Sequence, residues 1–183
     1  MVLPGFLATD RTTLGLQRAL GRAGYRVSGW GLGMNPGVRP DTLERIAARL
    51  ERFGGGAPVI LVGWSLGGIY AREVAKLRPE LVAKVITLGT PFSGDRRNNN
   101  VWRLYEAVAR HPVDRPPLEG DPALKPPVPT LALWSRWDGI VAAAAARGEP
   151  GERDREQELD CRHMGFAVSA RAYPAIVRAI ADF

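Results

Sequence analysis

The stretch PVILVGWSLGGIYA, residues 58–71, decides the fold that we expect of this chain. Its first half is an uninterrupted apolar run, which is typical of a central strand buried on both faces of a parallel sheet. Its second half has the pattern of a helix, and Gly63, Ser65 and Gly67 lie where the two halves meet. We therefore predict a sharp strand-to-helix turn, with glycines where a Cβ would collide with the opposing arms.

Ser65 stands at the centre of this turn, in the pattern G-x-S-x-G. A serine hydroxyl is a poor nucleophile and must be held out where a base can reach it, which a strained turn achieves. The pattern alone is weak, because short sequences match it by chance, and the serine could merely cap the helix. The apolar strand before Ser65 and the helix after it favour the interpretation of Ser65 as a nucleophile over that of a helix cap.

Short β-rich runs alternate with helical patterns along the rest of the chain. This alternation predicts one α/β domain over residues 1–183, with a mostly parallel sheet of about six strands and helices on both faces. The expected strands are residues 2–3, 25–30, 58–62, 82–88, 128–134 and 156–160. The expected helices are residues 12–24, 41–53, 66–77 and 173–183. Residues 142–155 are not assigned to a helix or a strand, although the alanines at their start suggest a helical turn.

The alternation stops in residues 92–127, which contain a run of three asparagines and many prolines. We interpret this segment as a small lid-like excursion over the edge of the sheet, since long loops in compact domains are often lids. A plain insertion without a function is the alternative.

A nucleophilic serine needs a base, and the chain has two histidines. His163 follows the last expected strand, whereas His111 lies inside the proline-rich segment. Loops that follow parallel strands gather at one edge of the sheet, where the Ser65 turn also lies. We therefore predict that His163 is the base and that His111 is a surface histidine.

A third group must orient the imidazole, and Asp138 follows the expected strand 128–134 at the same edge. The order Ser65, Asp138, His163 is the serine–acid–histidine order of such sheets. Glu158 and Asp160 are alternative acids, but both lie close to His163 along the edge strand.

The developing oxyanion would need two backbone donors. The Leu66 N–H, at the start of the helix, is the first candidate. The second should come from the loop after the first strand, where Gly5 permits a turn that aims the Phe6 N–H inward. The N–H of Leu7 is the alternative to that of Phe6. This stretch could also be an ordinary Pro-Gly turn at the end of a strand, with no part in catalysis.

Other kinds of site find little support in the sequence. Residues 29–33 read GWGLG, but the dinucleotide fingerprint would need glycine where Met34 stands, and no helix opens there. Two distant histidines and one cysteine do not make a zinc site. We expect no metal and no nucleic-acid partner.

The bulk composition fits a globular protein of 183 residues with 45% hydrophobic residues. No apolar run is long enough to span a membrane, no signal peptide is readable, and Cys161 has no partner for an internal disulfide. These features favour a cytoplasmic setting. The net charge of +6 most simply reflects an arginine-rich solvated surface, with a weak contact to anionic membranes as the alternative.

These motifs together resemble bacterial α/β-hydrolases related to lipases and esterases. The resemblance covers nearly the whole chain and includes, besides the Ser65 turn and His163, the segments PGF (4–6), LGTPF (88–92) and WSRWDGIV (134–141). It implies hydrolysis of carboxylic esters, small-molecule esters or lipids as substrates, no cofactor, and Ser65, Asp138 and His163 as the triad. An acyltransferase or thioesterase with the same triad is the alternative, and a non-catalytic binding protein on this scaffold is less favoured.

The sequence departs from this family in three places. Pro4-Gly5 stands where members commonly carry His-Gly, and Arg162 precedes the histidine where serine or glycine is usual. Only Met1 to Leu3 precede the first turn, although a buried strand usually has about five or six residues. We therefore expect that the natural chain starts upstream of Met1.

Overall fold

A parallel β-sheet organises the residues that this computed structural model describes, which are 1–94 and 120–183. Within these residues the sheet has five strands in the order β1-β2-β3-β4-β5, and every neighbouring pair is parallel. The strands are β1 (Val2–Leu3), β2 (Val59–Trp64), β3 (Val82–Leu88), β4 (Thr130–Trp134) and β5 (Arg155–Glu158). The predicted α/β class with a parallel sheet is therefore confirmed.

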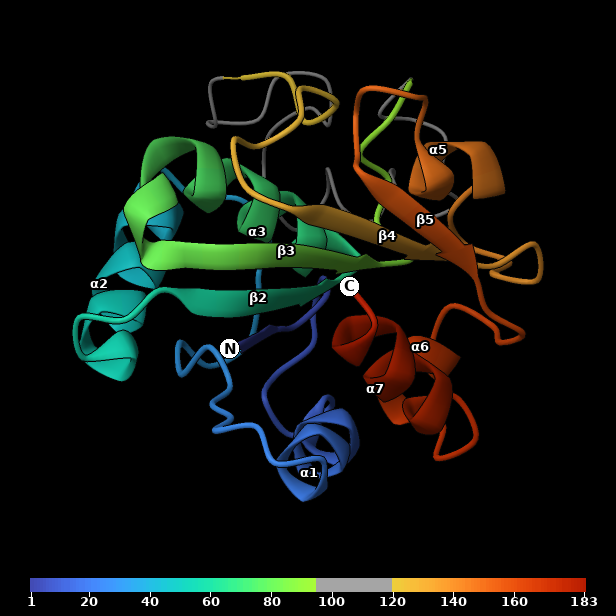
Figure 1. Cartoon of the computed structure of the whole chain (residues 1–183), viewed down its shortest axis with the longest axis horizontal. Helices are drawn as coiled ribbons and strands as arrows, with labels where there is room; N and C mark the ends of the chain where they lie inside the picture. The colour runs from blue at the N-terminus through green and yellow to red at the C-terminus, as the bar shows by residue number, and fades with distance from the viewer. Residues whose placement is uncertain (95–119) are drawn as a thin grey trace.

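Helices cover both faces of the sheet (Figure 1). One face carries α2 (Thr42–Gly54), α3 (Leu66–Leu77) and α5 (Ala143–Arg147), with the 3₁₀ turn η1 (Pro79–Leu81) before β3. The other face carries α1 (Leu14–Arg22), α6 (Gly165–Val168) and α7 (Tyr173–Ala181). None of the helices in the described part of the chain is long and apolar enough to cross a membrane.

Alternate side chains of β1, β2 and β3 enter two separate cores, as the pleat of a strand requires. On the α1 and α7 face, Val62 and Ile86 pack in one cluster with Leu16 and Ile176. On the α2 and α3 face, Leu61, Val85, Ile46 and Val74 belong to a second cluster. The apolar run of residues 58–62 is thus buried on both faces, which is why it shows no polar alternation.

The expected strand over residues 25–30 does not form. Within the described residues only Gly29 pairs with the sheet, through a single parallel bridge to Val2. The two-residue strand β1 offers little backbone for pairing, and the N–H groups of Trp30 and Gly31 turn away to donate to the Asp10 carboxylate, at 2.9 Å each. The described sheet therefore has one strand fewer than we expected.

Residues 95–119 of the expected lid-like segment, and with them His111, lie outside the described residues. The described end of that segment is held by Arg72, a fully buried residue of α3. Its guanidinium lies over the Phe92 ring at 4.1 Å, and burial lowers its pKa to about 10. It donates to the carbonyl oxygens of Pro122 (2.7 Å), Ala123 (3.1 Å), Leu124 (3.3 Å) and Glu152 (2.9 Å).

Arg72→Met should destabilise the protein, because it leaves four carbonyl oxygens without their donor while keeping the apolar stem of the side chain. We expect a loss of about 2–4 kcal/mol in the free energy of unfolding, measured with urea. Arg18→Met, at an exposed position of α1, is the control and should change it by less than about 0.5 kcal/mol. Equal stability of the two variants would contradict the role given to Arg72.

Candidate active site

Ser65 joins β2 to α3 in a left-handed backbone conformation. Its φ is 54° and its ψ is −123°, values that a residue with a side chain adopts only when its surroundings impose them. Two bonds fix the turn: the Ser65 N–H donates to the Leu88 carbonyl oxygen at 2.9 Å, and the Gly68 N–H donates to the Ser65 carbonyl oxygen at 2.9 Å. The predicted strained strand-to-helix turn is present.

Three glycines leave room for other parts of the chain to approach this turn closely. A Cβ on Gly63 would lie 2.4 Å from the Gly67 carbonyl oxygen, and a Cβ on Gly67 would lie 2.4 Å from that of Leu3. The collision at Gly63, with the opposite arm of the turn, is the predicted one, whereas a Cβ on Gly67 would meet the end of β1 instead. The structure adds Gly68, where a Cβ would lie 1.9 Å from Thr90 Oγ1.

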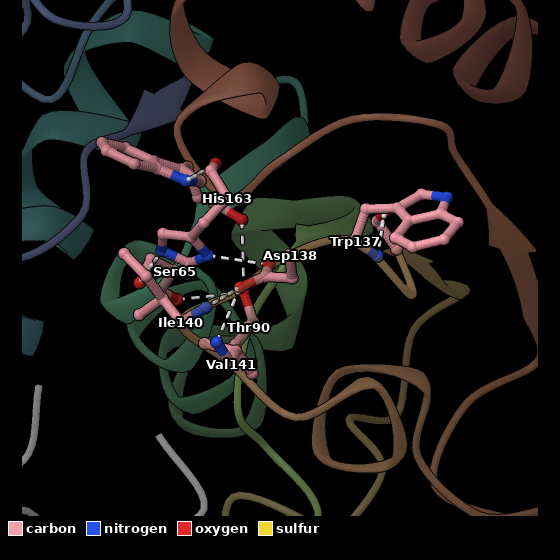
Figure 2. A network of polar contacts seen from close by, with 10 residues as sticks. Ser65, Thr90, Trp137, Asp138, Ile140, Val141 and His163 are labelled. Atoms are coloured by element: carbon pink, nitrogen blue, oxygen red, sulfur yellow. Dashed lines mark hydrogen bonds and ion pairs between the residues drawn. The ribbon is translucent and has the colours of Figure 1, made fainter. Parts of the chain in front are cut away.

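The structure brings Ser65, Asp138 and His163 together, although they lie 25 to 98 residues apart in the chain (Figure 2). Asp138 Oδ2 lies 2.8 Å from His163 Nδ1, and His163 Nε2 lies 3.0 Å from Ser65 Oγ. An ionised carboxylate can only accept, so Nδ1 carries the proton and Nε2 accepts from the Ser65 hydroxyl. Asp138 and His163 are buried, whereas Ser65 is half-buried.

The second oxygen of Asp138 is also satisfied. Asp138 Oδ1 accepts the N–H of Ile140 at 2.9 Å and of Val141 at 2.6 Å, so the turn after β4 holds the carboxylate in place. The two alternative acids lie elsewhere: Glu158 is paired with Arg136, and Asp160 is exposed. Of the three candidates, only Asp138 has a carboxylate oxygen hydrogen-bonded to the imidazole.

Two further side chains support the triad geometry. Trp64 is buried beside His163, with its ring centroid 5.6 Å from the imidazole, and its Nε1 donates to the His163 carbonyl oxygen at 3.1 Å. Thr90 Oγ1 donates to the Ser65 carbonyl oxygen at 2.9 Å. Sequence reasoning assigned neither role, although both residues belong to the motifs that carried the family resemblance. Exposed Trp137 lies beside Asp138 on the side away from Ser65 (Figure 2).

The loop after β1 lies directly against the serine. A Cβ on Gly5 would be 3.2 Å from Ser65 Cβ and 3.1 Å from Trp64 Cε3, so a side chain there would push against both residues. The loop turns tightly, because the Ala8 N–H donates to the Gly5 carbonyl oxygen at 3.1 Å and Leu7 has a φ of 57°. The Leu7 N–H donates to the Asn35 backbone carbonyl oxygen at 2.7 Å, so this N–H is already engaged within the fold.

Potential metal ligands and the Cys161 thiol were the other reactive groups to consider. In the described residues, no group of three or more histidine, cysteine, aspartate or glutamate side chains could hold a metal ion. Burial, followed by the charges of Asp138 and Asp160, raises the pKa of the Cys161 thiol to about 12. This thiol is therefore protonated at neutral pH and is a poor nucleophile.

A parallel sheet with helices on both faces and a serine on the turn between strand and helix defines the α/β-hydrolase fold. The model of the alpha/beta hydrolase family matches residues 2–181, so the chain belongs to this family.

Known proteins share parts of this sequence and its fold. A triacylglycerol lipase from Pseudarthrobacter phenanthrenivorans is 35% identical over 85 residues, which are 44% of this chain and 27% of the lipase. The bifunctional biotin-biosynthesis protein BioHC of Teredinibacter turnerae is 40% identical over 60 residues, or 33% of this chain and 10% of that protein. The matches thus span about a quarter or less of these relatives. The esterase domain of a Rhodothermus marinus protein superimposes with a TM-score of 0.67 at 18% identity, over 99% of this chain and 84% of that domain.

Gly63→Ala should disrupt the turn, because the new Cβ would meet backbone atoms of Gly67 and Gly68 that cannot move without breaking α3. We expect a loss of at least about 2 kcal/mol in the free energy of unfolding. Gly21→Ala is the matched control: its Cβ would meet nothing within 4 Å, and it lies inside α1. We expect this variant to be as stable as the wild type or more so by up to about 1 kcal/mol. Similar stability of the two variants would show that the turn is not tightly packed.

Proposed function

We propose that this protein is a serine hydrolase that cleaves carboxylic esters, including lipid esters, through an acyl-enzyme intermediate. The observation that carries the proposal is the continuous hydrogen-bonded chain from Asp138 through His163 to Ser65 Oγ, with distances of 2.8 Å and 3.0 Å. The triacylglycerol lipase among the sequence relatives supports ester substrates.

The geometry suggests a sequence of steps. Ser65 Oγ attacks the ester carbonyl carbon while its proton passes to His163 Nε2, and Asp138 stabilises the imidazolium that forms. The N–H groups of Leu66 and Phe6 are proposed to bind the oxyanion of the tetrahedral intermediate. His163 returns the proton to the departing alcohol, which leaves the acyl group on Ser65. Water, deprotonated by His163, then releases the carboxylic acid and restores the serine.

Ser65→Ala should abolish covalent labelling by a fluorophosphonate, because the reagent needs the activated hydroxyl. Intact-protein mass spectrometry of the wild type should show one adduct, located on the peptide that contains Ser65. Ser169→Ala, at a half-buried serine next to α6, is the control and should label like the wild type. Labelling that persists in Ser65→Ala, or a wild type that does not label, would refute the nucleophile and with it the proposed function.

Asp138→Asn should lower kcat for p-nitrophenyl esters by as much as about 10⁴-fold, since the amide no longer selects the imidazole tautomer with its proton on Nδ1. Asp160→Asn and Glu158→Gln test the alternative acids and should keep kcat within about threefold of the wild type, because neither side chain contacts the imidazole. A loss of less than about tenfold in Asp138→Asn would exclude Asp138 as the orienting acid.

The same esters, offered in increasing acyl length and with competing alcohols, separate hydrolysis from acyl transfer. A hydrolase releases free acid as the main product in the presence of the alcohol. A main product that is the new ester, or a preference for thioesters over esters, would replace the proposed reaction by an acyltransferase or thioesterase reaction of the same triad.

A further inference from the structure

Asn35 is a fully buried amide that binds both ends of the loop between Pro4 and Ala8. Its Nδ2 donates to the Pro4 carbonyl oxygen at 2.9 Å. Its backbone N–H donates to the Ala8 carbonyl oxygen at 2.8 Å, and its backbone carbonyl oxygen accepts the Leu7 N–H at 2.7 Å. One residue therefore makes three hydrogen bonds to a turn that contains Phe6.

The conformation of this turn has to be imposed from outside. Leu7 has a φ of 57°, a strained value for a residue with a side chain. Leu7 is also 40% exposed, so burial of its side chain does little to hold it. The hydrogen bond from the Leu7 N–H to Asn35 is the contact that acts on the strained residue itself.

The side chain of Asn35 also connects this turn to α3. Asn35 Oδ1 accepts the hydroxyl of Tyr70 at 3.1 Å and the N–H of Gly37 at 3.2 Å. Tyr70 is fully buried on α3 and stacked with Trp30, with ring centroids 6.4 Å apart and planes 6° apart. A rigid chain of contacts thus runs from α3, the helix that begins at Leu66, through Tyr70 and Asn35 to the loop that holds Phe6.

We propose that Asn35 is a positioning residue for the oxyanion site, where it fixes the Phe6 N–H at the correct distance from the Leu66 N–H. This inference rests on the proposed function. The Asn35 amide donates to the Pro4 carbonyl oxygen and accepts from the Tyr70 hydroxyl at once. An aspartate has the same shape, but its ionised side chain cannot donate, and it places a negative charge against the Pro4 carbonyl oxygen.

A displaced oxyanion donor has a kinetic signature that general damage to the fold does not have. The donor binds the oxygen most strongly in the transition state, so its displacement lowers kcat and leaves KM nearly unchanged. A boronic acid forms a tetrahedral adduct on the serine that resembles this state, so its affinity should fall together with kcat. Labelling with a fluorophosphonate to completion counts the intact sites, so kcat can be expressed per active serine.

Asn35→Asp should lower kcat per active serine by about 10- to 100-fold, with KM within about threefold of the wild type and boronic acid affinity weakened in parallel. Tyr70→Phe keeps the hydrogen bond from Asn35 to Pro4 but removes the Tyr70 hydroxyl that donates to Asn35 Oδ1. We therefore expect about a two- to fivefold loss of kcat. Tyr173→Phe is the matched control. It removes a hydroxyl that donates to the Ala167 carbonyl oxygen on the other face of the sheet, and kcat should not change.

Two results for Asn35→Asp would overturn the inference, provided that Ser65 of the wild type labels normally. The first is a kcat within twofold of the wild type. The second is a fall in kcat without a fall in boronic acid affinity. If Asn35→Asp does not fold, Tyr70→Phe decides by the same criteria, and a kcat equal to that of Tyr173→Phe would overturn the inference. Failure of the proposed function is distinguishable, because it would appear as absent labelling of Ser65 in the wild type.

Discussion

The strained backbone of Ser65 is the constraint on which the rest of the site depends. With a φ of 54°, the residue places its hydroxyl oxygen 3.0 Å from His163 Nε2. The neighbours that stabilise this conformation must come close, so Gly63, Gly67 and Gly68 have no room for a Cβ. The bond from the Ser65 N–H to Leu88 extends the pairing of β2 and β3 by one residue into the turn. The sheet therefore contributes directly to holding Ser65.

The parallel sheet explains why residues distant in sequence meet at this edge. Each strand delivers its following loop to the same end: β1 the turn with Phe6, β2 the serine, β4 the aspartate and β5 the histidine. The Asp138–His163 pair then adds a bond between backbones, because the His163 N–H donates to the Asp138 carbonyl oxygen at 2.9 Å. Burial of this pair is tolerated because both oxygens of the carboxylate have donors.

Local pattern predicted the parts of this structure that local physics determines. The apolar run before Ser65, the helix over residues 66–77 and the strand over residues 82–88 follow from periodicity, and the order of the strands places Asp138 and His163 at the edge of Ser65. The strand expected over residues 25–30 failed because pairing depends on the partner strand, and β1 has only two residues. The roles of Gly68, Thr90 and Asn35 are set by contacts across the fold, which leave no periodic signal in the sequence.

Within the described residues, the two strained positions outside glycine, Ser65 and Leu7, lie in adjoining turns, and this arrangement has a physical reason. In the proposed mechanism the Ser65 hydroxyl and the Phe6 N–H both face the same reacting carbonyl, and each lies in a turn that contains one of these strained residues. Strain of this kind persists only when the surrounding contacts outweigh it. For Ser65 the contacts come from β3 and the first turn of α3, whereas for Leu7 they come from Asn35. Because Tyr70 connects Asn35 to α3, the two strained turns share one support, and a change that loosens the helix would move both groups relative to the substrate.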